Sequence, residues 1–227
     1  MCEISLFTSR CNSGRLPPIL IKGNKMENIE ISLNREYILA GDISASMRTV
    51  DPKCMNLTRY TYMLEKFKSF IQTTSDFDKH GGCTIMLFGK DVHKYEHANL
   101  ATVEGRLDRI EFEPLTMTDK LLLEAFEEHL EEKVKMLKEK EIHPGTTLMI
   151  FTDGEPTDSM SVKRVITEIE NKIDLDIEFK IIFLTVGTVS LGVYNFLQDL
   201  VKLSKKKIVS VYELDKIEFI AAASGVV

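Results

Sequence analysis

The sequence lacks the features of secreted and membrane-spanning proteins. Only four of its 227 residues are cysteine, and no two are spaced as C-x-x-C. A chain of this length does not need disulfide bonds to hold its core. No apolar run reaches the roughly 18 residues that span a bilayer, and the N-terminus lacks the basic region and apolar block of a signal peptide. We therefore expect reduced thiols, no membrane segment and a cytoplasmic location.

The sequence also lacks a basic excess and the glycine-rich loops that bind phosphates. Lysine and arginine number 29 against 35 aspartate and glutamate residues, and the net charge of −6 argues against a nucleic-acid partner. The one dense basic run, 205–207, is interpreted as a solvated turn. Neither GxxxxGK(S/T) nor GxGxxG occurs, so nucleotide chemistry has no phosphate cradle.

Composition divides the chain into an arm and one domain. Residues 1–28 contain two adjacent prolines, two glycines and two of the four cysteines, and we interpret them as a loosely structured N-terminal arm. Residues 29–227 form the predicted domain. The chain is long enough to bury about 70% of the surface that it exposes when unfolded.

From residue 29 onward, short apolar strands alternate with helices whose apolar residues recur every three or four positions. The predicted strands are 29–43 with a turn at 34–35, 83–88, 92–95, 147–152, 179–186 and 208–211. The predicted helices are 56–74, 100–109, 118–140, 161–173, 191–203 and 216–223. The longest helix has the apolar stripe Leu122, Phe126, Leu130, Val134 and Leu137. This alternation predicts an α/β fold, with a doubly wound, mostly parallel sheet and helices on both faces.

Oxygen-bearing side chains follow two of these strands. The stretch AGDISASM places Asp42, Ser44 and Ser46 at alternate positions where the first strand ends, and Asp153 follows strand 147–152. In a doubly wound sheet, ligands bind beyond the carboxyl ends of the strands, where the strand order reverses. With the threonines that precede the longest helix, the candidate ligands are Asp42, Ser44, Ser46, Thr116, Thr118 and Asp153.

An oxygen-only set of this kind suits a hard cation, Mg²⁺ or Mn²⁺. Two carboxylates do not over-neutralise a divalent ion, so a carboxylate from a protein partner is the expected further ligand. Each piece also has an ordinary structural interpretation, because D-x-S-x-S and T-D-G occur in turns and threonine caps helices. The order of the pieces and their places in the strand–helix pattern favour the cation site.

The stretches Asp42-Ile-Ser-Ala-Ser46 and Thr152-Asp-Gly154, with Thr116 between them, resemble the metal-ion-dependent adhesion site (MIDAS) of von Willebrand factor A (VWA) domains. The resemblance covers roughly residues 30–225. It implies a Rossmann-like six-stranded sheet in the order 3-2-1-4-5-6, strand 3 being an antiparallel edge. It makes Asp42, Ser44 and Ser46 ligands from the first loop, and Asp153 a ligand from the last loop that often acts through water.

Two positions depart from the family pattern. Ala45 stands where glycine is common between the two serines, which is a small change. Pro114-Leu115 replace the glycines that usually precede the ligand threonine, so Thr116 takes that role by position and Thr118 remains the alternative. The resemblance also implies a final helix whose shift is coupled to the ligand.

The resemblance implies a cytoplasmic adaptor domain that binds a protein partner through Mg²⁺ or Mn²⁺, with a glutamate or aspartate of the partner as ligand. We expect no catalytic residues, no nucleic-acid partner and no membrane partner; the oligomeric state is left open. One alternative is a Mg²⁺-dependent phosphatase or phosphotransferase of the D-x-D type, but Ser44 stands where its general acid/base would be. The other is a VWA scaffold without metal. His93 and His97 are interpreted as part of a solvated edge rather than a zinc site.

Overall fold

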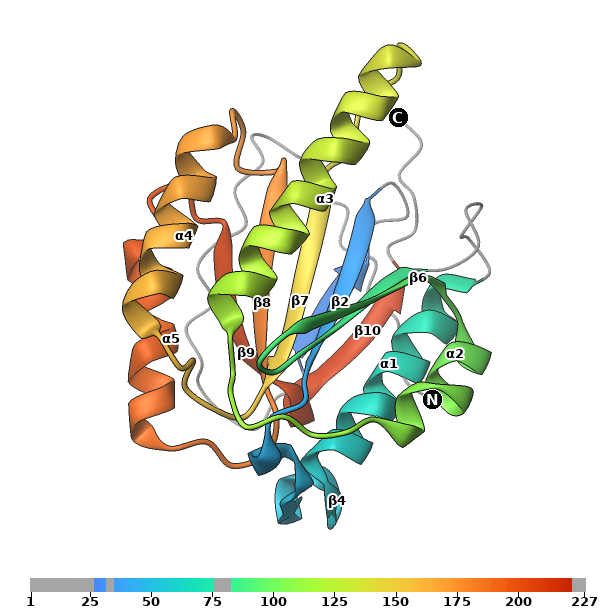
Figure 1. The fold of residues 1–227 in the computed structure, drawn as a ribbon, viewed down its shortest axis with the longest axis vertical. Helices are drawn as coiled ribbons and strands as arrows, with labels where there is room; N and C mark the ends of the chain where they lie inside the picture. The colour runs from blue at the N-terminus through green and yellow to red at the C-terminus, as the bar shows by residue number, and fades with distance from the viewer. Residues whose placement is uncertain (1–26, 32–34, 76–82, 222–227) are drawn as a thin grey trace, which may run out of the picture.

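The computed structural model describes residues 27–31, 35–75 and 83–221 (Figure 1). The predicted arm, 1–28, lies outside the described residues except for Glu27 and Asn28, which begin strand β1 (Glu27–Ile31). No helix among the described residues is long and apolar enough to cross a membrane.

Six strands form the central sheet. They are β2 (Glu36–Asp42), β5 (Cys83–Phe88), β6 (Val92–Ala98), β7 (Thr146–Thr152), β8 (Phe179–Thr185) and β9 (Val209–Glu213). Their spatial order is β6-β5-β2-β7-β8-β9, and β6 is antiparallel to β5 whereas the other neighbours are parallel. Counted along the chain within this sheet, the order is 3-2-1-4-5-6. The predicted α/β fold and its antiparallel edge strand are therefore confirmed.

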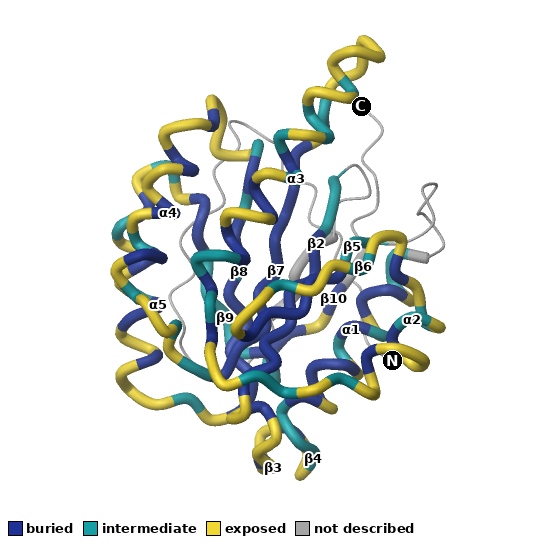
Figure 2. Tube along the Cα trace, viewed as in Figure 1, coloured by how far each residue is buried: buried dark blue, intermediate teal, exposed yellow. Residues whose placement is uncertain are grey.

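Helices cover both faces of the sheet (Figure 1). One face packs against α1 (Arg59–Ser75) and α2 (Leu100–Gly105), and the other against α3 (Thr118–Lys138), α4 (Ser159–Lys172) and α5 (Leu191–Leu203). Two apolar clusters fill the spaces between sheet and helices, and the four inner strands, β2, β5, β7 and β8, are mostly buried (Figure 2). Burial on both faces explains why the strands read as continuous apolar runs.

Short elements connect this framework. Single 3₁₀ turns are η1 (Ala45–Arg48), η2 (Pro52–Cys54), η3 (Leu107–Arg109) and η4 (Leu214–Lys216), and β3 (Val50–Asp51) pairs with β4 (Leu57–Thr58). Helix α4 begins after Asp158, whose carboxylate accepts a hydrogen bond from the Ser161 amide at 2.9 Å. Ser190 caps α5 in the same way. These side chains satisfy amides that have no partner within the helix.

The C-terminal segment differs from the prediction. The helix expected at 216–223 is instead η4 followed by strand β10 (Ile217–Ala221), and residues 222 and 223 lie outside the described part. Ile217 and Phe219 are buried whereas Glu218 is exposed, which is the period-two pattern of a strand. Phe219 packs edge-on against Phe70 of α1, with ring centroids 5.4 Å apart. Within the described residues, the final helix predicted at 216–223, to which the family resemblance assigned a ligand-coupled shift, is therefore not formed.

The strand predicted over 29–43 is divided between two sheets. Its first part, β1, pairs in parallel with β10, and its second part, β2, lies at the centre of the six-stranded sheet. Residues 32–34 between them lie outside the described part. Periodicity alone could not show this division, because the partner of β1 is nearly two hundred residues away in sequence.

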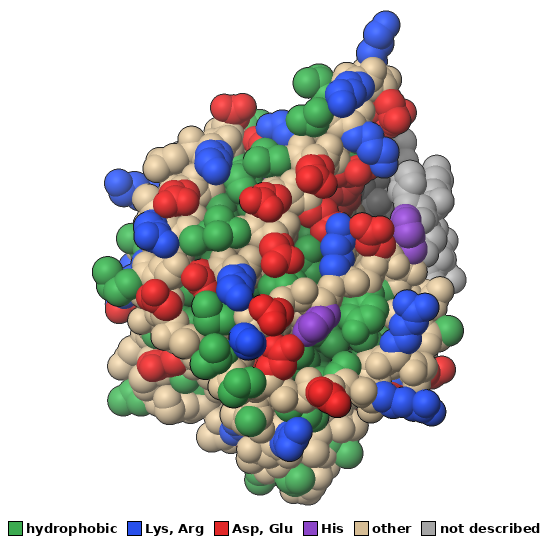
Figure 3. Space-filling model, viewed as in Figure 1, with side chains coloured by type: hydrophobic (Ala, Val, Ile, Leu, Met, Phe, Trp, Pro, Cys, Tyr) green, Lys and Arg blue, Asp and Glu red, His purple; other side chains and the backbone are tan. Residues whose placement is uncertain are grey.

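The apolar stripe predicted for α3 is wrong at its end. Leu122 and Phe126 are buried, but Val134 and Leu137 are 51% and 72% exposed. The C-terminal end of α3 extends past the sheet, and charged side chains surround its apolar ones there (Figures 1 and 3). The apolar residues of α3 keep their helical spacing past the end of the sheet, so the last of them have no core to pack against.

His129 of α3 gives the core a sensitivity to acid. Its ring is fully buried, and Nδ1 lies 2.9 Å from the Thr146 hydroxyl. Burial and the neighbouring His143 lower the pKa of His129 to about 4, although Glu178 opposes the shift and Lys133 adds to it.

We expect this histidine to destabilise the fold as the pH falls. The unfolded chain takes up the proton near pH 6.5 whereas the folded chain does not until about pH 4, so stability declines between these values. At pH 5 the loss is about 2 kcal/mol. Because Asp42 changes stability in the opposite direction over this interval, the test is the difference between two proteins: from pH 7 to pH 5, urea unfolding should show wild type losing about 2 kcal/mol relative to His129→Gln. Equal changes in the two proteins would exclude His129 as the cause.

Candidate metal centre

The candidate site lies at the carboxyl edge of the sheet, where the strand order reverses. Strand β2 ends at Asp42, and its neighbour β7 ends at Thr152, directly before Asp153. The two strands are parallel and paired up to Gly41 and Phe151. From β2 the chain continues to β5 on one side and later returns to β7 on the other, so these loops meet at a topological switch point.

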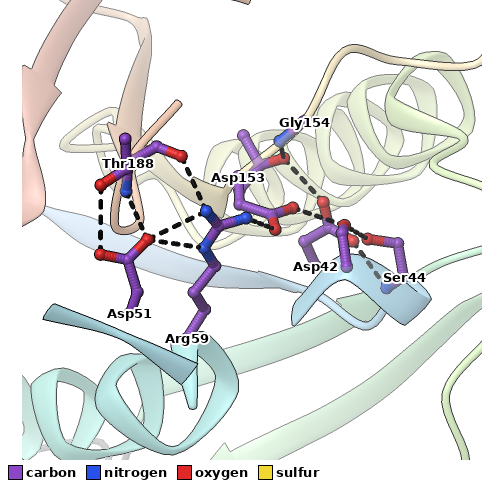
Figure 4. A network of polar contacts seen from close by, with 9 residues as sticks. Asp42, Ser44, Asp51, Arg59, Asp153, Gly154 and Thr188 are labelled. Atoms are coloured by element: carbon purple, nitrogen blue, oxygen red, sulfur yellow. Dashed lines mark hydrogen bonds and ion pairs between the residues drawn. The ribbon is translucent and has the colours of Figure 1, made fainter. Parts of the chain in front are cut away.

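Hydrogen bonds join four of the predicted ligands into one chain of contacts (Figure 4). Asp42 accepts from the Ser44 amide through Oδ1 and from the Thr152 hydroxyl through Oδ2, both at 2.7 Å. The hydroxyls of Ser44 and Ser46 lie 3.0 Å apart. Ser46 in turn donates to Oδ1 of Asp153 at 2.8 Å. The two loops thus bring two carboxylates and two serine hydroxyls together.

The first loop is held in place from both sides. The Ile43 amide donates to the Phe88 carbonyl, and the Ile43 carbonyl accepts from the Glu113 amide, each at 2.9 Å. Met47 in η1 is fully buried in the core between the sheet and α1. Because the Met47 side chain is buried in this core, the loop turns at Ser44, and its polar side chains lie at the carboxyl edge of the sheet.

Asp42 is a buried carboxylate that has no cationic partner among the described residues. Its exposed fraction is 0%, and its hydrogen bonds come only from neutral groups. Burial raises the pKa of Asp42 to about 6, and the nearby Asp153 raises it further while the hydrogen bonds oppose the shift. A buried charge of this kind normally has a counter-ion, so the position favours a cation.

No described contact joins Thr116 or Thr118 directly to the four residues of the network, and the structure does not choose between the two threonines. Thr116 is 8% exposed and Thr118 is 3% exposed. The Thr116 amide donates to the Thr157 hydroxyl at 3.0 Å, and its carbonyl accepts from the Thr157 amide at 2.9 Å, which ties Thr116 to the loop that carries Asp153. The N-cap of α3 is Met117, so neither threonine caps that helix. Their roles as ligands stay predictions.

Sequence reasoning missed Arg59, the first residue of α1. Its Nη1 donates to Oδ2 of Asp153 at 2.6 Å, and its Nε and Nη2 donate to Oδ2 of Asp51 at 3.2 and 2.9 Å. Its Nη2 also donates to the Thr188 carbonyl at 2.7 Å. Figure 4 shows the guanidinium between the two carboxylates. No local signal could reveal these contacts, because 94 residues separate Arg59 from Asp153 and 129 separate it from Thr188.

The charges of this network fit a divalent cation. Asp51 and Asp153 both pair with the single guanidinium of Arg59, and Asp42 contacts no cationic group among the described residues, so the three carboxylates together leave two negative charges. The donor set consists of carboxylate and hydroxyl oxygens, which Mg²⁺ and Mn²⁺ prefer. In the part of the chain that the structure describes, no three or more His, Cys, Asp or Glu side chains lie close enough together to hold a metal ion by themselves. A cation here would therefore depend on the hydroxyl groups.

Comparison with known proteins finds similarity in structure but not in sequence. No protein-family profile and no curated protein sequence matches the chain. The manganese-loaded TRAP protein of Plasmodium vivax aligns with 83% of this chain and 72% of its own, at 15% identity and a TM-score of 0.56. Proximal thread matrix protein 1 of the mussel byssus aligns with 82% of this chain and 45% of its own, at 14% identity and a TM-score of 0.52. At these identities the likeness concerns the fold.

Proposed function

Because the chain has the fold of VWA domains, we propose that it is a protein-binding domain that uses Mg²⁺ or Mn²⁺. The cation would be held by Asp42, Ser44, Ser46 and Asp153, with Thr116 or Thr118 as a further ligand. A glutamate or aspartate of the partner would supply the remaining negative charge.

The observation that carries this proposal is the buried, uncompensated carboxylate of Asp42 beside two hydroxyls. A site built only for structure would place a cationic side chain or an amide there, because an unpaired buried charge is costly. The serines add neutral oxygen atoms without further charge. A divalent ion held in this way keeps part of its attraction for an outside carboxylate, which is the chemistry that the cation supplies when bound.

Other observations support a binding role in the cytoplasm. The TRAP structure was solved with manganese, and its domain shares this fold. Burial raises the pKa of the Cys54 thiol to about 11, so it is a poor nucleophile. The same buried thiol is free, as expected in a reducing compartment. We therefore propose an adaptor rather than an enzyme.

Titration of the metal-stripped protein tests the proposal directly. We expect Mg²⁺ and Mn²⁺ to bind wild type in a calorimeter, and Asp42→Ala and Asp153→Ala to abolish binding. Metal at a hundredfold its dissociation constant should stabilise wild type by about 2.7 kcal/mol. In a domain of this size, that raises the melting temperature by roughly 5–10 °C.

Asp176→Ala is the matched control, because Asp176 is an exposed carboxylate that pairs with Lys180 at the start of β8, at the opposite edge of the sheet. It should bind metal as wild type does. Absence of binding by wild type would contradict the proposal and leave a VWA scaffold without metal. The ion pair between Arg59 and Asp153, which already neutralises one site carboxylate, favours that second candidate.

A further inference from the structure

Arg59 occupies an unusual place, because a cationic side chain contacts a proposed ligand of a cation. Its side chain is only 13% exposed, and the Asp153 side chain that it contacts is fully buried. Asp153 uses its two oxygens differently: Oδ1 accepts from Ser46 and Oδ2 accepts from Arg59. One oxygen therefore faces the serine hydroxyls, and the other is held by the guanidinium (Figure 4).

The guanidinium is fixed by contacts that do not involve Asp153. Asp51 accepts from both Nε and Nη2, and the Thr188 carbonyl accepts from Nη2. Asp51 is itself held by the Thr188 amide at 2.8 Å and the Lys53 amide at 2.9 Å. Arg59 is thus anchored to two loops, and Asp153 cannot rotate freely without losing a buried ion pair.

We propose that Arg59 is a positioning residue that limits how much of the Asp153 charge reaches a bound cation. This inference rests on the proposed cation site. By holding Oδ2, Arg59 keeps Asp153 from giving both oxygens to the metal, and its positive charge offsets part of the carboxylate charge. The cation binds less tightly as a result, but it stays more attractive to the carboxylate of a partner.

The proposal predicts opposite effects on two affinities. Arg59→Met removes the charge and keeps a long, unbranched side chain. We expect Mn²⁺ to bind this variant on the order of tenfold more tightly, since a neighbouring cation is gone and Asp153 is released. We expect acetate, as a probe for a partner carboxylate, to bind the Mn²⁺-loaded variant on the order of tenfold more weakly, because the ion is better neutralised.

Mn²⁺ electron paramagnetic resonance measures the first affinity, and water-proton relaxation of the Mn²⁺-loaded protein during an acetate titration measures the second. Arg59→Lys is the conservative control: it keeps the charge, so both affinities should stay close to wild type. Arg59→Met also leaves the buried Asp51 carboxylate without its cationic partner. The double variant Arg59→Met with Asp51→Asn removes that charge, and it should show the same two shifts if the single variant does not fold.

The outcomes separate this inference from the proposed function. If wild type binds no Mn²⁺, both are overturned. If wild type binds Mn²⁺ but the Arg59→Met variants bind it equally or more weakly, Arg59 serves only the fold and this inference alone is overturned. Tighter Mn²⁺ binding with unchanged acetate binding would also overturn it, because the charge of Asp153 would then not govern the second ligand.

Discussion

Asp42→Asn is expected to stabilise the metal-stripped protein at neutral pH, although it removes a central residue of the candidate site. Asp42 is fully buried, and its pKa is raised from 3.8 to about 6 by burial and by Asp153. An asparagine keeps an oxygen that can accept from the Ser44 amide, and it carries no charge. The substitution therefore removes the desolvation cost without removing the turn at Ser44.

The sign and size of this effect follow from the two protonation states. The pKa of Asp42 is higher in the folded chain than in the unfolded one, so its ionisation lowers the free energy of unfolding. This loss of stability is absent below about pH 4 and grows as the pH rises to 6. At pH 7 the full cost is about 3 kcal/mol. Asp42→Asn should thus raise the melting temperature of the stripped protein by roughly 6–12 °C at pH 7, and by much less at pH 4.

Adding Mg²⁺ should reverse the order of the melting temperatures of wild type and Asp42→Asn. Wild type should gain stability as Mg²⁺ is added, whereas Asp42→Asn should gain little. Asp153→Asn is the matched comparison, because Asp153 already has a cationic partner in Arg59; this variant should lose both metal binding and stability in the stripped state. Thermal melts of the three proteins with EDTA and with Mg²⁺ measure all six melting temperatures. A lower melting temperature of stripped Asp42→Asn at pH 7 would show that the Asp42 charge is compensated.

The parts of the fold that local patterns determine could be predicted from the sequence. The helix predicted at 191–203 has the bounds of α5, and strand 83–88 has the bounds of β5. Both have strong periodicity and clear ends, Gly89 for the strand and the Ser190 cap for the helix. The strand order came from the family resemblance, because spacing alone does not choose among doubly wound topologies.

The elements that depend on distant partners could not be predicted in the same way. Residues 216–223 contain three consecutive alanines, which favour a helix, but pairing with β1 makes 217–221 a strand. Val134 and Leu137 continue the helical spacing of α3, yet nothing in the sequence states where the sheet beneath them ends. For residues 217–221, pairing with a distant strand outweighed the local helix propensity. For α3, the helix formed, but the end of the sheet decided which of its apolar residues are buried.

The candidate site shows the same division. That Asp42 and Asp153 lie close together followed from their places after two strands, because parallel neighbours end at one edge. The contact between Arg59 and Asp153 followed from nothing local, although it decides the charge of the site. The choice between Thr116 and Thr118 stays open, since it depends on the loop before α3 rather than on a periodic element.

Asp51→Ala is expected to be the most destabilising single change around the site. Asp51 is 3% exposed, and its carboxylate accepts hydrogen bonds from Arg59, Lys53 and Thr188. Gly187 leaves room for it: at a φ of +71°, an added Cβ would lie 2.7 Å from Oδ2 of Asp51. Alanine would leave the guanidinium partly unpaired and the Thr188 amide without its acceptor. Loss of one partner of a buried ion pair costs about 3–5 kcal/mol.

The pH dependence of Asp51 has the opposite sign to that of Asp42. Burial alone would raise the pKa of Asp51, but the hydrogen bonds from Thr188, Arg59 and Lys53 outweigh it and lower the pKa to about 2. Its contribution to stability is therefore full above about pH 4 and is lost as the pH falls towards 2. Urea unfolding at pH 7 should show the destabilisation of Asp51→Ala, and the difference from wild type should shrink in acid.

Glu213→Ala provides the contrast that makes the test of Asp51 specific. Glu213 pairs with Lys53 across 3.0 Å at the same edge, but its side chain is 29% exposed and that of Lys53 is 42% exposed. Exposed pairs contribute about 1 kcal/mol or less. If Asp51→Ala costs no more than Glu213→Ala, Arg59 has other sufficient partners. The contact between Arg59 and Asp153 would then not depend on Asp51, and packing would hold the two loops together instead.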